Sequence, residues 1–150
     1  MRYLTCYLAG GIDRDNPWRQ KVLESCKDFP IQFYVPDEKL LYTTQGLAQA
    51  HKRDDSFDII DLWKVEECDV TFAYFSKESK SRFSGTTYEI AHANNHDKRV
   101  LVVCDMRPAT KNHYEFVLRQ ATRQYKTLDE GISKLQEWAQ SFQPVPKGEL

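Results

Sequence analysis

The stretch from Asp69 to Asp105, DVTFAYFSKESKSRFSGTTYEIAHANNHDKRVLVVCD, decides the fold of this chain. Asp69–Phe75 is a short apolar run of aromatic and β-branched residues, which predicts a buried strand. A polar segment, Lys77–Ser84, leads into a helix expected from Gly85 to about Asn95, and Arg99–Cys104 forms a second apolar strand. A strand, a helix and a strand at this spacing predict a parallel pair with a right-handed crossover.

The rest of the chain continues this alternation of strands and helices. Further strands are expected at Tyr3–Leu8, Ile31–Val35 and Gln124–Thr127, the last as a short edge strand. Helices are expected after an Asn16 N-cap from Pro17 to about Lys27, and over Ala50–Glu67, Asn112–Gln120 and Leu128–Phe142, with loops at Asp37–Gln49 and Met106–Thr110. The pattern predicts an α/β fold, a three-layer doubly wound sandwich. Its five-stranded parallel sheet has the flavodoxin-like order 2-1-3-4-5.

Length and composition bound the class of protein. The 150 residues suit a single domain, expected at residues 1–142, and the proline-containing end at residues 143–150 is expected to be a flexible tail. A net charge of −1 gives no basic field for a nucleic acid polymer or a membrane surface. Neither a signal peptide nor a membrane span is evident, which predicts a cytoplasmic protein. The four widely spaced cysteines are expected to be free thiols.

A ligand site is expected at the carboxyl edge of the sheet, where open α/β folds bind ligands at the switch point of strand order. The predicted order brings Gly10 and Gly11, which follow the first strand, beside the loop that precedes Glu89. Paired glycines permit a close approach of a ligand, and they equally suit a tight turn between a strand and a helix.

Glu89 itself has two interpretations. Thr86–Glu89 (TTYE) matches a capping box, in which Thr86 caps the helix and Glu89 reaches back to the amide of the cap. In the other interpretation Glu89 points into the cleft and attacks an anomeric carbon, holding the sugar as a glycosyl ester.

Two further clusters carry weaker signals. Glu89, His92 and His96 lie near one face of a helix, which is a metal-ligating pattern. Carboxylate-bridged sites need a second such helix, which this chain lacks, so surface histidines and no bound metal are expected. Asp54, Asp58 and Asp61 share one helix face, which is expected to be exposed to solvent. The basic residues of the Lys77–Ser84 loop are expected either to keep that loop solvated or to bind a phosphate.

Several of these segments resemble one family in their order and spacing. They are Tyr7–Gly11 (YLAGG) after the first strand, Asp61 ahead of Glu66–Val70 (EECDV), Ser84–Ala93 (SGTTYEIAHA) and Lys98–Val100 (KRV). Over roughly residues 3–112 the chain resembles the nucleoside 2-deoxyribosyltransferase family and its relatives that hydrolyse N-glycosides of nucleoside monophosphates. The most specific element is Gly-Thr-x-x-Glu-Ile-x-x-Ala, which begins at Gly85.

The resemblance implies roles for individual residues. Glu89 matches the nucleophile, Tyr7 the tyrosine that orients it, and Asp61 the aspartate that contacts the base. Asn112 matches an asparagine that reaches the site of a neighbouring subunit, so a homo-oligomer is implied. The substrate-binding set implied is Gly10, Gly11, Phe83, Ser84, Gly85, Thr86 and Asn112. Phe83 departs from the family, because many transferases carry an aspartate there, close to the base.

The function implied is cleavage of the N-glycosidic bond of a (deoxy)nucleoside through a covalent glycosyl-Glu89 intermediate, with transfer of the sugar to another nucleobase. No metal or organic cofactor is implied. One alternative is an N-glycoside hydrolase of a nucleoside 5′-monophosphate or an NAD-like dinucleotide, with Arg82, Ser84 and the helix N-terminus on the phosphate. Another alternative is a non-catalytic nucleotide-binding module in which Glu89 is only a cap.

Overall fold

The computed structural model describes residues 3–11, 17–35, 57–79 and 83–142. Several expectations lie outside these residues: the Asn16 cap, the loop 37–49, the helix before residue 57, the basic residues Lys80 and Arg82, and the tail 143–150. In the part of the chain that is described, no helix is long and apolar enough to cross a membrane.

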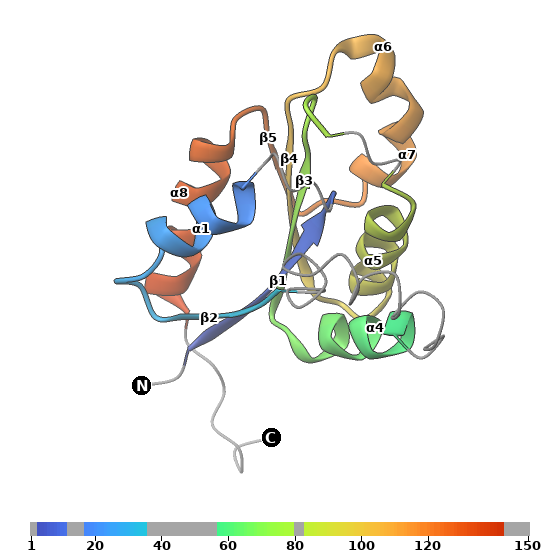
Figure 1. The fold of residues 1–150 in the computed structure, drawn as a ribbon. Coiled ribbons are helices and arrows are strands. Elements are labelled where there is room, and N and C mark those ends of the chain that lie inside the picture. The colour runs from blue at the N-terminus through green and yellow to red at the C-terminus, as the bar shows by residue number, and fades with distance from the viewer. Residues whose placement is uncertain (1–2, 12–16, 36–56, 80–82, 143–150) are drawn as a thin grey trace, which may run out of the picture.

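The sheet has the predicted architecture (Figure 1). Its strands are β1 (Leu4–Gly10), β2 (Ile31–Tyr34), β3 (Val70–Phe75), β4 (Arg99–Cys104) and β5 (Arg123–Tyr125). All four pairings are parallel, and the strand order is β2-β1-β3-β4-β5. The flavodoxin-like order is therefore confirmed.

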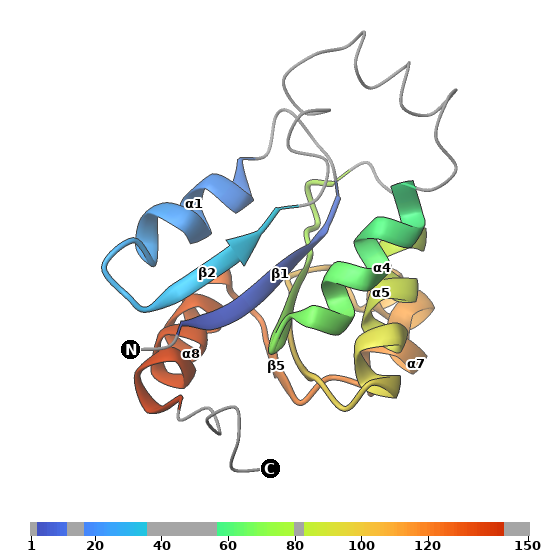
Figure 2. The same cartoon turned by 90° about the horizontal axis from the view of Figure 1, so that it is seen from below.

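Helices cover both faces of the sheet (Figures 1 and 2). The helices α1 (Trp18–Ser25) and α8 (Leu128–Ser141) pack on one face. The helices α4 (Phe57–Glu67), α5 (Ser84–Asn95) and α7 (Glu115–Leu118) pack on the other. Between β4 and α7 lie a short helix, α6 (Pro108–Lys111), and a 3₁₀ turn, η1 (Asn112–Tyr114).

Two local predictions around Pro108 were wrong. Pro108 begins α6 instead of lying in a loop, because the extended backbone of Arg107 places the proline in the first turn, where its missing N–H costs nothing. The single helix expected over residues 112–120 is divided into η1 and α7.

Strand β3 explains why the core has two sides. All six of its residues are buried, and alternate side chains enter opposite layers. Phe72 and Tyr74 join the layer under α1 and α8, where both contact the Trp18 ring. Ala73 and Phe75 join the layer under α4, α5 and α7. A continuous apolar run without alternation is typical of such a doubly covered strand.

The four cysteines are free and buried, as predicted. Burial raises the pKa of the Cys26 and Cys68 thiols to about 11. Burial also raises the pKa of Cys6 and Cys104 above the ordinary range. Because the thiolate is the reactive form, these side chains pack as small apolar groups.

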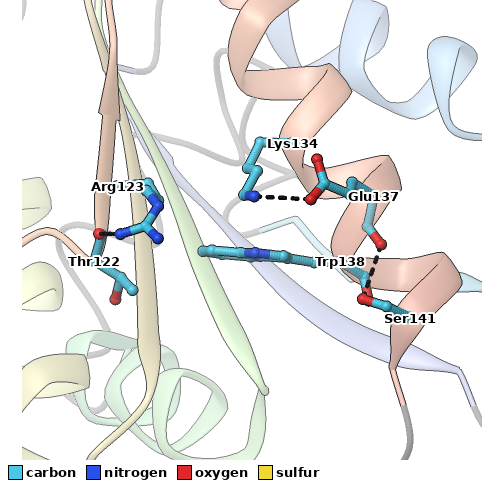
Figure 3. A network of polar contacts seen from close by, with 6 residues as sticks. All are labelled: Thr122, Arg123, Lys134, Glu137, Trp138 and Ser141. Atoms are coloured by element: carbon cyan, nitrogen blue, oxygen red, sulfur yellow. Dashed lines mark hydrogen bonds and ion pairs between the residues drawn. The ribbon is translucent and has the colours of Figure 1, made fainter.

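Trp138 fixes α8 to the sheet (Figure 3). The ring is 8% exposed, and the guanidinium of Arg99 on β4 lies 5.2 Å from its centroid. Lys134 lies 6.0 Å from the same centroid and pairs with Glu137 at 2.9 Å. The Thr127 hydroxyl accepts from the Glu130 amide and caps the helix. Cation–π contacts and a satisfied cap together anchor the terminal helix.

Candidate active site

Two elements that carry predicted site residues, β1 and α5, meet the carboxyl edge of the sheet. Strand β1 ends there at Gly10, β3 ends at Phe75, and α5 begins at Ser84 after the crossover. Helix α5 packs against β1, β3 and β4, so it covers the part of the sheet that includes the switch point between β1 and β3.

The start of α5 rules out the capping box. The N-cap residue is Phe83, in the left-handed conformation with φ 56°, and its side chain makes no capping hydrogen bond. The Thr87 amide donates to the Phe83 carbonyl at 2.9 Å. Thr86 is therefore the third helical residue, and its side chain is buried instead of capping. The capping-box interpretation of Glu89 was wrong, because the helix starts two residues before its expected cap.

Glu89 lies in the second turn of α5 and is half-buried. Its Oε2 atom is shielded from solvent. Its Oε1 atom lies 3.9 Å from the place a Cβ would occupy on the exposed Gly85, so the side chain turns back toward the helix N-terminus. One carboxylate oxygen thus points into the protein, and the other lies beneath a residue without a side chain.

Tyr7 lies on the same side of the sheet as α5. Its side chain is fully buried in the layer under α4 and α5, and its hydroxyl oxygen is shielded from solvent. The ring stacks on Tyr34 with centroids 5.5 Å apart. Thr71, its register partner on β3, is also buried, and its Oγ1 has no hydrogen-bond partner among the described residues. Sequence patterns did not single out Thr71, because a threonine in a strand gives no signal of a polar role.

Asp61 lies on α4, the neighbour of α5. It is half-buried, four residues after Phe57, the first described residue of α4, and Glu89 is five residues after Ser84. Both acidic residues therefore lie in the second turn of two helices that pack against each other.

Phe83 belongs to an aromatic cluster below the edge. Its ring is 4% exposed and lies 4.9 Å from the Phe75 ring and 5.8 Å from the Tyr114 ring. The cluster joins the start of α5 to η1, which carries the exposed Asn112. The phenyl ring thus packs in the protein, and contact between Phe83 and a base stays a prediction.

The Gly10 position is explained by packing. Its φ is +155°, and a Cβ there would lie 2.6 Å from Cζ2 of Trp18 and 3.1 Å from the Tyr74 carbonyl oxygen. Both the backbone conformation and the space require glycine. Of the two interpretations of the glycine pair, this observation supports a backbone turn; close approach of a ligand stays a prediction.

Arg19 holds this turn in place. It is 7% exposed, and its guanidinium donates to the carbonyls of Gly11 and Gly10, both at 3.1 Å, and of Leu8 at 3.5 Å. The guanidinium also lies 4.6 Å from the centroid of the Trp18 ring. Sequence analysis missed Arg19, because an arginine on an amphipathic helix is ordinarily solvated.

Replacing Arg19 with methionine should test this role. Methionine keeps the apolar stem but leaves buried carbonyls without their donor, so we expect the free energy of unfolding to fall by about 2 kcal/mol. Urea denaturation measures the change. Arg107→Met is the matched control, because Arg107 is exposed, and equal losses in the two variants would contradict the role of Arg19.

The Asp105 carboxylate, just after β4, connects this strand to the end of β3 and the segment that follows it. The Tyr74 hydroxyl donates to Asp105 at 2.7 Å, and the Lys77 amide donates to the same carboxylate at 2.6 Å. Burial, together with the Asp105 carboxylate, raises the pKa of Tyr74 to about 12. Tyr74 therefore stays protonated at neutral pH and acts as a donor that holds the edge together.

The side chains of Glu89, His92 and His96 do not form one cluster, although their spacing suits one face of a helix. The two histidines lie with Glu66 of α4 instead, and His92 Nε2 is 2.8 Å from Glu66 Oε1. Glu89 is not in this group. Helical spacing suggested the wrong carboxylate, because the partner comes from a neighbouring helix.

Comparisons with known proteins agree with this fold. The chain resembles a 2-deoxyribosyltransferase from Bacillus psychrosaccharolyticus, with a TM-score of 0.59, 13% identity, and coverage of 84% of this chain and 88% of that one. It also resembles a CMP N-glycosidase from Clostridium botulinum, with a TM-score of 0.54, 14% identity, and coverage of 89% and 98%. No curated protein sequence matches the chain. The sequence model of the family described as "Nucleoside 2-deoxyribosyltransferase like" matches residues 3–107. That span includes Tyr7, Asp61 and Glu89, and the chain belongs to the nucleoside 2-deoxyribosyltransferase-like family.

Proposed function

We propose that this protein is an enzyme that cleaves the N-glycosidic bond of a (deoxy)nucleoside and passes the sugar to another nucleobase. The observation that carries the proposal is the Glu89 carboxylate. It is half-buried one turn below the carboxyl edge, in a segment that matches the family. A partly desolvated carboxylate at this edge is suited to attack an electrophilic carbon.

In the proposed reaction a Glu89 oxygen attacks the anomeric carbon through an oxocarbenium-like transition state. The bond from that carbon to the base nitrogen breaks, and its electron pair leaves with the base, which takes up a proton. Asp61 or a water molecule supplies that proton. The sugar remains as an ester on Glu89 until a nitrogen of the second base attacks the same carbon and releases the carboxylate. The proton of that nitrogen passes to Asp61 or to water, which restores the starting state.

The other residues of the proposal bind and orient. Tyr7 holds the Glu89 carboxylate in line from the buried side of the sheet. The proposed substrate contacts are Gly10, Gly11, Phe83, Ser84, Gly85, Thr86 and, from a neighbouring subunit, Asn112. Because Thr86 and Phe83 are almost fully buried, we expect their contribution to come through the backbone at the start of α5.

One observation favours the hydrolytic alternative. The N-terminus of α5 lies at the carboxyl edge, and the side chain of its N-cap residue Phe83 makes no capping hydrogen bond. The first-turn amides have no partner within the helix and carry the positive end of its dipole, which suits the phosphate of a nucleoside 5′-monophosphate or a dinucleotide. Water would then take the place of the acceptor base.

Product analysis decides between these activities. The protein is incubated with deoxynucleosides, nucleoside 5′-monophosphates and NAD, each with and without an acceptor base, and the products are separated by chromatography. We expect a new nucleoside that depends on the acceptor base. Release of free sugar or sugar phosphate without an acceptor would establish the hydrolase. No turnover of any substrate would contradict both and leave a binding module.

A homo-oligomer is also proposed, through the layer of α4, α5 and α7. Large exposed aromatic side chains lie on these helices: Trp63 is 58%, Tyr88 64% and Phe116 84% exposed. Exposed apolar side chains gathered on one layer are typical of an interaction surface. We expect sedimentation to show at least a dimer at micromolar concentration, and Phe116→Ser with Tyr88→Ser to weaken it. A monomeric wild type would contradict the role of Asn112 at a neighbouring site.

A further inference from the structure

Glu66, His92 and His96 form a cluster at the carboxyl ends of α4 and α5. The Nε2 atoms of His92 and His96 lie 2.8 and 3.2 Å from the same oxygen, Oε1 of Glu66. The imidazole rings are 4.3 Å apart. One ligand atom from each side chain lies within 4.8 Å of the other two. Three side chains from two helices thus direct donor atoms at one point.

The hydrogen bonding of His96 turns its Nε2 atom toward Glu66. Its Nδ1 atom is 2.8 Å from the His92 carbonyl oxygen, and a carbonyl only accepts, so Nδ1 carries a hydrogen. Nε2 is therefore the ring nitrogen that remains for a ligand, and it lies 3.2 Å from Glu66 Oε1.

We propose that Glu66, His92 and His96 bind a divalent transition-metal ion such as Zn²⁺. Imidazole nitrogens and a carboxylate oxygen are ligands that this ion accepts, with a water molecule in the fourth position. Bonds of about 2.1 Å in a tetrahedron place neighbouring ligand atoms about 3.4 Å apart. The present separations of 2.8 and 3.2 Å need to widen by only a few tenths of an ångström.

Access from solvent favours this site. The side chains are 38%, 21% and 42% exposed for Glu66, His92 and His96, so an ion and its water can enter from solvent.

The ion would join two helices at the end remote from the catalytic edge. Glu66 is the last residue but one of α4 and His96 follows α5, whereas Asp61 and Glu89 lie nearer the starts of the same helices. A metal bridge there fixes α4 against α5, and so stabilises the elements that carry the two proposed site carboxylates. This inference does not depend on the proposed activity.

Metal binding is measured on the purified chain after treatment with EDTA. Titration with Co²⁺ should give the visible absorption of a four-coordinate site at about one ion per chain, and Zn²⁺ should displace it. Excess Zn²⁺ should raise the melting temperature by about 5 °C, and EDTA should reverse this. His92→Asn, His96→Asn and Glu66→Gln should each abolish the absorption and the thermal shift. His113→Asn, an exposed histidine on η1, should keep both.

Two outcomes overturn the proposal. The first is equal Co²⁺ binding by the wild type and the His92 and His96 variants. The second is no response of the wild type to either metal. Circular dichroism of each variant confirms that the fold persists, as expected for these partly exposed side chains.

Discussion

Replacing Glu89 with glutamine should lower turnover by several orders of magnitude, about 10³-fold or more, while the protein stays folded. Glutamine has nearly the same shape but lacks the charge, and its amide does not readily form a glycosyl ester. Because Glu89 is not the capping residue of α5, the substitution removes no helix cap. Steady-state kinetics with the best substrate of the panel measures the loss, and thermal denaturation checks the fold.

Glu137→Gln is the matched control for this variant. Glu137 is an exposed helical glutamate on α8, on the opposite face of the sheet, and its pair with Lys134 contributes little at the surface. In the wild type, a 2-fluoro-2-deoxy nucleoside should slow both chemical steps and leave a sugar on Glu89, visible by mass spectrometry of the peptide. Near wild-type turnover by Glu89→Gln would refute the assignment of the nucleophile.

The second large effect is expected on stability, from Phe83→Asp. Phe83 is 4% exposed between the Phe75 and Tyr114 rings, so the substitution removes an aromatic ring and buries a carboxylate without a cation. We expect the free energy of unfolding to fall by about 3–5 kcal/mol. Denaturation in urea measures it.

Tyr3→Asp is the control for Phe83→Asp, because Tyr3 is 55% exposed and lies outside the helices of the proposed oligomer surface, so its loss should change stability by less than about 0.5 kcal/mol. The outcome also concerns substrate recognition, since the family resemblance implies that position 83 lies close to the base. A stable Phe83→Asp variant with altered base preference would contradict the packing explanation and place this position beside the base.

The sheet was predictable from the sequence because its signals are local. The apolar runs that became β3 and β4 are buried on both faces, and helices separate each strand from the next. Strand order then followed from the rules that govern parallel connections. The start of α5 was not predictable in the same way, because Thr86–Glu89 imitates a cap while the backbone of Phe83 takes a left-handed conformation.

For the candidate site, topology predicted which elements lie together, while the roles of the residues stay predictions. Tyr7 lies in the layer covered by α5, the helix that carries Glu89. What the sequence did not reveal are contacts between distant segments. Arg19 bonds to the carbonyls of β1, and Glu66 meets His92 across two helices. Such partners depend on how helices pack, which no spacing along the chain encodes.

The short outer strands of the sheet restrict pairing between the sheet edges of different copies of this protein. Strand β2 has four residues and follows Pro30, and β5 has three, with Arg123 and Gln124 exposed. Short outer strands offer few unpaired backbone groups to another chain, and the Arg123 charge on β5 opposes pairing further; natural sheets resist edge-to-edge aggregation in this way. The edges of a native copy therefore offer a partially unfolded copy few backbone groups with which to form a new strand. We expect heating to yield amorphous precipitate instead of fibrils that bind thioflavin T.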